Sequence, residues 1–455
     1  MTDKDNPQTD SVKSDEKHNA TWHRIKDSVH RRLLTILDLH EARQVPIEQL
    51  RRECSSKIDA LLGEQGYPLS SPEKDQLLHE VMNEVFGFGP LEQFLADPEI
   101  SDILVNGPHK VYIEKHGRLE QTDASFANND HLMRVISRIA SNVGRRIDES
   151  IPMLDARLPD GSRVNAIIPP LALDGPMLSI RRFGAEPINI NNLMQMNSLT
   201  KEMAFFLDAC VRCRMNILIS GGTGTGKTTL LNALSRWIPA GERVVTIEDA
   251  AELKLQREHV VRLETRPPNI EGKGQINQRD LLRNSLRMRP DRIIIGEVRG
   301  EETLDMLQAM NTGHEGSMTT VHANSPRDAL RRLENMVSMA GITYPVQAMR
   351  EQISSALNVL VHVDRITGGA RKVTNIAEIT GTEGDVICLH DIFRFKQLGV
   401  DDHGNAYGQF ETCGVRPNLV NKLKTEGIDI PSILFQRRVL AETDKESSET
   451  KKQEK

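Results

Sequence analysis

Between residues 21 and 87 the apolar residues recur at helical spacing. The first predicted helix carries them every three or four positions, at Trp22, Ile25, Val29, Leu33 and Ile36. Pro46 opens a second amphipathic helix, and Ser71-Pro72 has the N-terminal chemistry of a third. This pattern predicts a small helical bundle. Two interpretations stay open: the bundle packs on the next domain, or it is a docking module for a partner.

Residues 88–183 change to short apolar runs separated by turns. The pattern predicts strands at 103–105 and 111–113, a helix at 132–143, and a meander of strands from 153 to 183. These elements indicate an α/β domain. Residues 184–197, which contain Gly184 and Pro187, are predicted to form a linker that works as a hinge.

From 198 to 395 strands alternate with helices, which indicates a parallel sheet. The predicted strands are 217–220, 243–247, 260–263, 293–295, 317–321 and 359–363. Residues 396–440 have little pattern and receive no assignment. Residues 1–20 and 441–455 are charged, with few large apolar side chains, and are predicted to be disordered tails.

Composition argues against one class of partner and indicates the cellular compartment. The net charge is −6, only 4% of residues are aromatic, and no long basic stretch occurs, so nucleic acid is not an expected partner. Five scattered cysteines fit a reducing compartment, and Cys210 and Cys213 are interpreted as buried helix residues because no second pair completes a zinc site. No apolar run reaches the ~18 residues of a membrane-spanning helix, and the polar N-terminus is not a signal peptide. We expect a cytoplasmic protein.

The chemistry begins with a glycine-rich loop between an apolar strand and a helix. Gly221 to Thr228 fits the pattern G-x-x-x-x-G-K-[ST], whose backbone N–H groups cradle phosphates. Lys227 is expected to reach the β- and γ-phosphates, and the Thr228 hydroxyl to bind Mg²⁺. The predicted binding residues are Gly221, Gly222, Thr223, Gly224, Thr225, Gly226, Lys227, Thr228 and Thr229. The ligands are therefore ATP and Mg²⁺.

Three further strands end in polar residues. Glu297 follows an apolar run after a glycine, Glu248 ends a run about twenty residues after Lys227, and His322 ends a third. Such acids can hold Mg²⁺ through water or activate the attacking water. We assign Glu297 as the base and leave the reverse assignment to Glu248 open, with His322 as a γ-phosphate sensor. Zinc at His314 and His322 is disfavoured because no third ligand recurs nearby.

Four ordered motifs resemble a known family: GGTGTGKTTLLN, VVTIEDAAEL, RPDRIIIGEVRG and TGHEGSMTTVHANSP. They look like the secretion ATPases of type II and type IV secretion and of type IV pili. Upstream, FGFGPLEQFLADPEISDILVNGP is similar to the CpaF-type ATPases of Flp/Tad pilus assembly. The resemblance implies a RecA-like P-loop ATPase domain and a homohexameric ring. It also implies ATP-driven extrusion or retraction of pilin through inner-membrane platform proteins, at the cytoplasmic face of the inner membrane.

Two arginines are candidates for catalysis across a subunit boundary. Arg157 and Arg163 flank a Pro-Asp-Gly turn and have no obvious local partner in the sequence, so we expect them to reach a neighbour's γ-phosphate. The rival functions are a type IV secretion traffic ATPase, a DNA translocase and a passive nucleotide switch. The low aromatic content disfavours the translocase, and the polar strand ends disfavour the switch.

Overall fold

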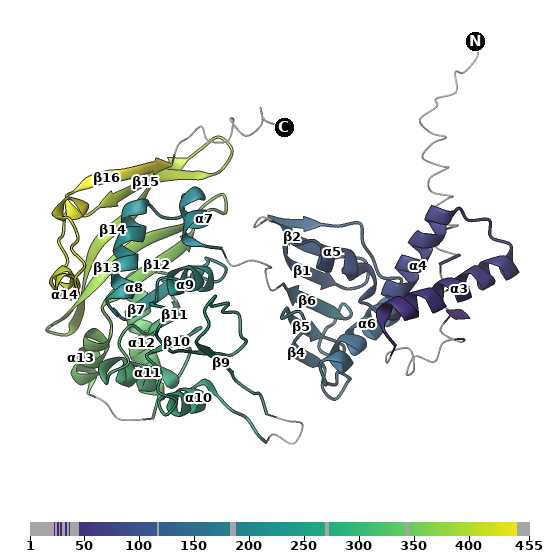
Figure 1. Cartoon of the computed structure of the whole chain (residues 1–455), viewed down its shortest axis with the longest axis horizontal. Coiled ribbons are helices and arrows are strands. Elements are labelled where there is room, and N and C mark those ends of the chain that lie inside the picture. Colours follow the sequence, from purple (N-terminus) through teal and green to yellow (C-terminus); the bar gives the residue numbers. More distant parts are fainter. Residues whose placement is uncertain are drawn as a thin grey trace, which may run out of the picture. The chain divides into compact units, whose positions relative to one another are not determined.

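The computed structural model describes residues 45–115, 118–182, 188–268, 273–341 and 345–443, and eight residues between Trp22 and Ile36. The chain divides into two compact units, 1–184 and 185–455 (Figure 1). The predicted hinge residues Gly184 and Pro187 lie outside the described residues, as do the predicted tail at 1–20 and most of the tail at 441–455.

The predicted helical faces of the bundle are buried in part: Ile25, Val29 and Leu33 are buried, but Ile36, which was placed on the same face, is 52% exposed. Helix α3 (Ile47–Gln65) begins directly after Pro46, and helix α4 (Ser71–Val85) begins with a capping box between Ser70 and Glu73. One buried cluster joins these helices to the first segment; it includes Ile25, Val29, Leu33, Cys54, Ile58, Leu77 and Val81.

Helix α4 contacts the α/β part of the first unit through Glu84. Glu84 Oε2 lies 2.7 Å from His131 Nε2, and Arg138 donates to the Glu84 carbonyl oxygen at 2.8 Å. Although burial opposes ionisation, the hydrogen bonds and charges of His131 and Lys26 lower the pKa of Glu84 to about 2. These contacts favour the packing interpretation of the bundle.

The first unit contains a six-stranded antiparallel sheet with the order β3-β2-β1-β6-β5-β4. The strands are β1 (Ile100–Asn106), β2 (Val111–Lys115), β3 (Arg118–Gln121), β4 (Met153–Arg157), β5 (Arg163–Ile167) and β6 (Met177–Arg181). Helix α6 (Asn129–Asn142) buries Leu132, Val135 and Ile139 in the core of this unit, and short helices η1 (Gly89–Leu91) and α5 (Glu92–Ala96) precede the sheet. Strand β3 was not predicted, since all four of its residues are exposed.

The second unit is built on a ten-stranded sheet with the order β16-β15-β14-β13-β12-β7-β11-β10-β8-β9 (Figure 1). The six strands from β12 to β9 run parallel, as predicted. They are β7 (Ile217–Gly221), β8 (Val244–Glu248), β9 (Val260–Glu264), β10 (Arg292–Ile295), β11 (Met318–His322) and β12 (Val359–Arg365). These parallel strands form the sheet for which the sequence predicted a RecA-like P-loop domain.

Helices cover both faces of this sheet. Helices α8 (Lys201–Arg212) and α9 (Lys227–Ser235) belong to one buried cluster. Helices α10 (Gln278–Ser285), α11 (Glu302–Asn311), α12 (Pro326–Met339) and α13 (Val346–Ala356) belong to the other. Cys210 within α8 and Cys213 at its C-terminal end are buried, as predicted. The parallel strands are therefore covered on both sides, which fits their nearly continuous apolar sequences.

Three assignments change at the borders of this unit. The predicted linker contains helix α7 (Ile190–Gln195), started by reciprocal capping between Asn189 and Asn192. The unassigned region forms β14 (Val386–Val400), β15 (Ala406–Thr412), α14 (Leu419–Thr425) and η2 (Ser432–Phe435), after β13 (Arg371–Glu383). The predicted tail at 441–455 is wrong for its first three residues, which belong to β16 (Arg438–Thr443), because backbone pairing with β15 orders them whatever their side chains.

Candidate nucleotide site

The glycine-rich loop has the local geometry of a phosphate cradle. It leaves the buried strand β7 and enters α9 through Gly224 and Gly226, whose φ angles of +71° and +98° are in the left-handed region that favours glycine. A side chain on Gly221 would collide with the carbonyl oxygen of Val363 in β12. Thr228 is the second residue of α9, so its hydroxyl lies at the positive end of the helix.

Lys227 is buried within this loop. Its Nζ donates to the carbonyl oxygen of Gly222 at 2.8 Å and lies 3.4 Å from His322 Nε2. Burial lowers the pKa of Lys227, and the charge of Glu297 opposes this. An anionic ligand would offset the desolvation of this ammonium group, so the position suits a phosphate.

The strand order brings the predicted residues to one edge of the sheet in a fixed sequence. Strands β7, β11, β10 and β8 are consecutive neighbours and parallel, so their carboxyl ends lie together. Across the edge one meets the P-loop, then His322, then Glu297, then Glu248. His322 pairs in register with Gly221.

Glu248 is the most buried of the candidate catalytic groups, with 3% of its surface exposed. Its Oε2 accepts hydrogen bonds from the backbone N–H groups of Glu252 and Leu253, at 2.7 and 2.9 Å. Its Oε1 is buried and has no hydrogen-bond partner among the described residues. Burial raises the pKa of Glu248 to about 7. A carboxylate with a free oxygen and a pKa near neutrality suits proton abstraction from water.

Gly296, which stands where many P-loop proteins have aspartate, makes room for this carboxylate. A Cβ atom at Gly296 would lie 2.9 Å from Cγ of Glu248 on the neighbouring strand. The backbone N–H of Gly296 donates to the Ile247 carbonyl oxygen, which keeps the two strand ends close.

Glu297 is held in a more open network. Its Oε1 lies 3.2 Å from His322 Nε2, and its Oε2 lies 3.1 Å from Arg299 Nη2. Arg299 also reaches Asp249 at 3.4 Å. Burial lowers the pKa of His322, with Glu297 opposing and Lys227 reinforcing the shift, so a neutral imidazole is favoured at pH 7. The sequence motifs contained Arg299 and Asp249, but nothing in the local pattern assigned them this bridging role.

The residues present fit Mg²⁺ bound together with a nucleotide. No group of three or more His, Cys, Asp or Glu side chains in the described ranges forms a metal site by itself. Mg²⁺ is usually held by one or two protein oxygens together with substrate phosphates, and bound there it neutralises phosphate charge. The Thr228 hydroxyl at the start of α9 is a suitable oxygen, with Glu248 and Glu297 as ligands through water.

The expectation that Arg163 has no local partner is wrong. Arg163 has a local partner: its Nε and Nη2 donate to the two carboxylate oxygens of Asp155 at 3.0 and 2.6 Å. Arg157 lies opposite Arg163 in the register of β4 and β5. Both belong to the first unit, whereas the P-loop, Glu248, Glu297 and His322 belong to the second.

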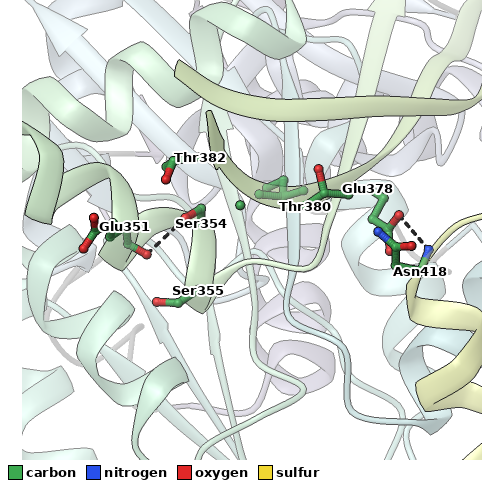
Figure 2. Close-up of a pocket in the computed structure, with 9 residues that line it drawn as sticks. Glu351, Ser354, Ser355, Glu378, Thr380, Thr382 and Asn418 are labelled. Carbon is green, nitrogen blue, oxygen red and sulfur yellow. Dashed lines mark hydrogen bonds between the residues drawn. The ribbon is translucent and has the colours of Figure 1, made fainter. Parts of the chain in front are cut away.

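A cavity of about 410 Å³ lies away from this edge, between α13, β13 and the start of α14. Figure 2 shows its hydroxyl-rich lining, with Glu378 accepting from the backbone of Asn418. Glu378 also accepts from Leu419, so its carboxylate caps α14. None of the predicted nucleotide residues lines this cavity.

A family profile described as "Type II/IV secretion system protein" matches residues 84–387. The chain belongs to this family. With the P-loop geometry, membership makes it an ATP-hydrolysing secretion ATPase. This match does not distinguish the CpaF type from other members of the family.

Individual relatives agree with the family. A "Putative conjugal transfer protein MT3759" of Mycobacterium tuberculosis is 36% identical over 341 residues, covering 70% of this chain and 96% of the relative. The "Type IV secretion system protein VirB11" of Bartonella quintana is 30% identical, covering 66% of this chain and 96% of the relative. The solved VirB11 ATPase of Brucella suis is 30% identical and covers 63% of this chain and 94% of its own, with a TM-score of 0.35. No helix in the described part of the chain is long and apolar enough to span a bilayer.

Proposed function

We propose that this secretion ATPase powers assembly of a Flp/Tad-type pilus. A homohexameric ring at the cytoplasmic face of the inner membrane would move a platform protein and so extrude, or also retract, pilin. The observation that carries this proposal is the resemblance of residues 86–108 to CpaF-type chains, beyond the four motifs shared by the whole family.

Conjugal transfer is the second candidate, favoured by relatives that are named as conjugal transfer proteins. The two are separated by replacing the chromosomal gene with a Lys227→Ala variant and scoring surface pili and plasmid transfer in the same cells. Lost pili with normal transfer supports the pilus motor, and the converse supports conjugal transfer. Lys201→Ala, at an exposed lysine of α8, is the matched control and should leave both phenotypes intact.

The chemistry proposed for the site reverses our sequence-based assignment of the acids. Glu248 acts as the general base, because its buried, unpartnered Oε1 can accept a proton from the attacking water at neutral pH. Glu297 orients His322, which faces Lys227 and the γ-phosphate position. Bound Mg²⁺ would neutralise the phosphates beside Thr228.

Arg157 and Arg163 remain proposals as fingers that reach a neighbouring subunit's nucleotide. Such a residue contributes about 10³–10⁵-fold where it has been measured. In a ring, Arg157→Ala subunits mixed with Lys227→Ala subunits should recover part of the ATPase activity, because some interfaces then combine an intact arginine with an intact P-loop. Mixed rings verified by native mass spectrometry that stay inactive would place the arginine's action within its own subunit.

A further inference from the structure

The loop that follows β8 folds back onto the carboxylate of Glu248. Residues 249–255 form no helix or strand, so a regular ladder does not hold their backbone N–H groups. Two of these groups, on Glu252 and Leu253, donate to Glu248 Oε2 at 2.7 and 2.9 Å. The loop therefore orients the carboxylate, and the position of the loop decides where the second oxygen, Oε1, lies.

The next amide of this loop is held by helix α9. The backbone N–H of Lys254 donates to Oδ1 of Asn232 at 3.0 Å. Asn232 stands four residues after Thr228, one turn further along the same face of α9. The helix that begins in the P-loop therefore holds, through one side-chain amide, the loop that binds Glu248.

Apolar packing places the loop against the same helix. Leu253 is fully buried and belongs to the same cluster as Leu230, Leu231 and Leu234 of α9. Burial of a leucine side chain is attractive but has no direction, whereas a hydrogen bond requires alignment of its donor and acceptor. The bond to Asn232 therefore fixes the direction of the Lys254 amide in a way that the packing of Leu253 does not.

The two ends of the loop are held by different elements. At its start, Thr265 Oγ1, which follows β9, donates to the carbonyl oxygen of Asp249 at 3.2 Å. At its end, Asn232 of α9 accepts from Lys254. The two amides that bind Glu248 lie between these contacts, so loss of the contact at Asn232 frees the end of the loop that is nearer to them.

We propose that Asn232 is a positioning residue for ATP hydrolysis: it holds residues 252–254 so that Glu248 keeps its orientation toward the attacking water. The inference rests on the proposed role of Glu248 as the base. It adds the residue through which the P-loop helix orients that carboxylate. Asn232 acts through Glu248 and takes no part in the proton transfer itself.

Steady-state kinetics of two variants test this role. Asn232→Ala removes the acceptor and should lower kcat about tenfold to 100-fold, because a misplacement of about 1 Å can have an effect of this size. KM should stay within a few-fold, since the P-loop is unchanged. Asn232→Asp keeps an oxygen at the same position and should recover most of the turnover. Parental kcat in Asn232→Ala, or an Asn232→Asp variant that is equally slow, would overturn the proposal.

The chain offers a matched control for these variants. Asn421 is an exposed asparagine of α14, and its Oδ1 also accepts a hydrogen bond, from Arg416 Nη2 at 3.4 Å. Asn421→Ala should keep the kcat and KM of the parent. A loss of turnover there equal to that of Asn232→Ala would show that the effect is not specific to the loop, and would count against the proposal.

A double-variant cycle separates positioning from a general loss of structure. In a Glu248→Gln background the base is already absent, so adding Asn232→Ala should lower kcat by less than about twofold more. Equal factors in the two backgrounds would indicate a merely structural role and overturn the inference. Parental turnover in Glu248→Gln alone would refute the proposed base and the inference with it. A slow Glu248→Gln with a fast Asn232→Ala would refute only the inference.

Hydrogen exchange tests the contact itself. Peptides that cover residues 249–255 should exchange faster in Asn232→Ala than in the parent and at the parental rate in Asn232→Asp. Peptides from strand β9 should be unchanged in both variants. Parental exchange at 249–255 in Asn232→Ala would show that Asn232 does not hold the loop, and the inference would fail.

Discussion

Replacing Glu248 with glutamine should stabilise the second unit at high pH while it removes catalysis. The carboxyl group has its pKa raised by burial from 4.5 to about 7. Between these two values the native state keeps a proton that the unfolded chain releases, so stability falls as the pH rises through this window. Because glutamine does not ionise, the variant does not lose this folding stability as the pH rises. At about 1.4 kcal/mol per pKa unit, the variant should gain up to about 3 kcal/mol at pH 8, falling to about 1 kcal/mol at pH 5.

The chain offers a clean fluorescence assay for this prediction. It has two tryptophans, Trp22 in the first unit and Trp237 packed on the core of the second. In a Trp22→Phe background, guanidinium unfolding followed by Trp237 fluorescence reports the unit that holds Glu248. Glu258→Gln, at an exposed carboxylate, is the control and should change stability by less than about 0.5 kcal/mol at either pH.

The same variant separates the two candidate bases. Glu248→Gln should bind ATP and lose about 10²-fold or more in turnover, and the parent's turnover should rise between pH 6 and 8 as Glu248 ionises. A stability change that does not depend on pH would refute the burial argument. Normal hydrolysis by Glu248→Gln, with a dead Glu297→Gln, would restore the sequence-based assignment.

Three other perturbations follow from the contacts. Lys227→Ala should abolish hydrolysis and weaken ATP binding in calorimetry, since it removes the ammonium beside the phosphate cradle; unchanged affinity would contradict this. Gly296→Ala should lower turnover about tenfold or more with ATP affinity within a few-fold, because its Cβ would crowd the Glu248 carboxylate; parental turnover would show that the carboxylate can shift freely. Glu84→Gln should destabilise the first unit by about 2–3 kcal/mol at pH 7, followed by Trp22 fluorescence in a Trp237→Phe background. Because the pKa of Glu84 is lowered, that difference should shrink as the pH falls from 4.5 toward 2, and a constant difference would argue against the ion pair.

The sequence predicted the parallel strands and the P-loop because each depends on local signals. An apolar run bounded by polar residues marks a buried strand, and a glycine spacing marks the loop. Strand β16 carried no such signal, since its order comes from pairing with β15 across the sheet. Helix α7 was missed because asparagine replaced the usual acid in its capping box.

Long-range contacts limited the prediction of the site. Arg371 lies 144 positions after Lys227 and touches the P-loop only because β13 follows β12 beside β7. The assignment of the base depended on burial, which no motif records. Glu248 ends an apolar strand and Glu297 comes just after another, and only the structure distinguishes the enclosed carboxylate from the partly open one. Arg163 was misjudged because Asp155 sits on the opposite strand of a hairpin, eight residues away.

The close approach of Gly296 to Glu248 leaves no space for a side chain at position 296 while the Glu248 carboxylate stays in its place. The acid missing from one strand is thus supplied by its neighbour. Gly296→Asp combined with Glu248→Ala would move the carboxylate back across one strand spacing, about 4.8 Å. Activity recovered in that double variant would mean that the site requires an acid within reach of the water and is indifferent to the strand that carries it.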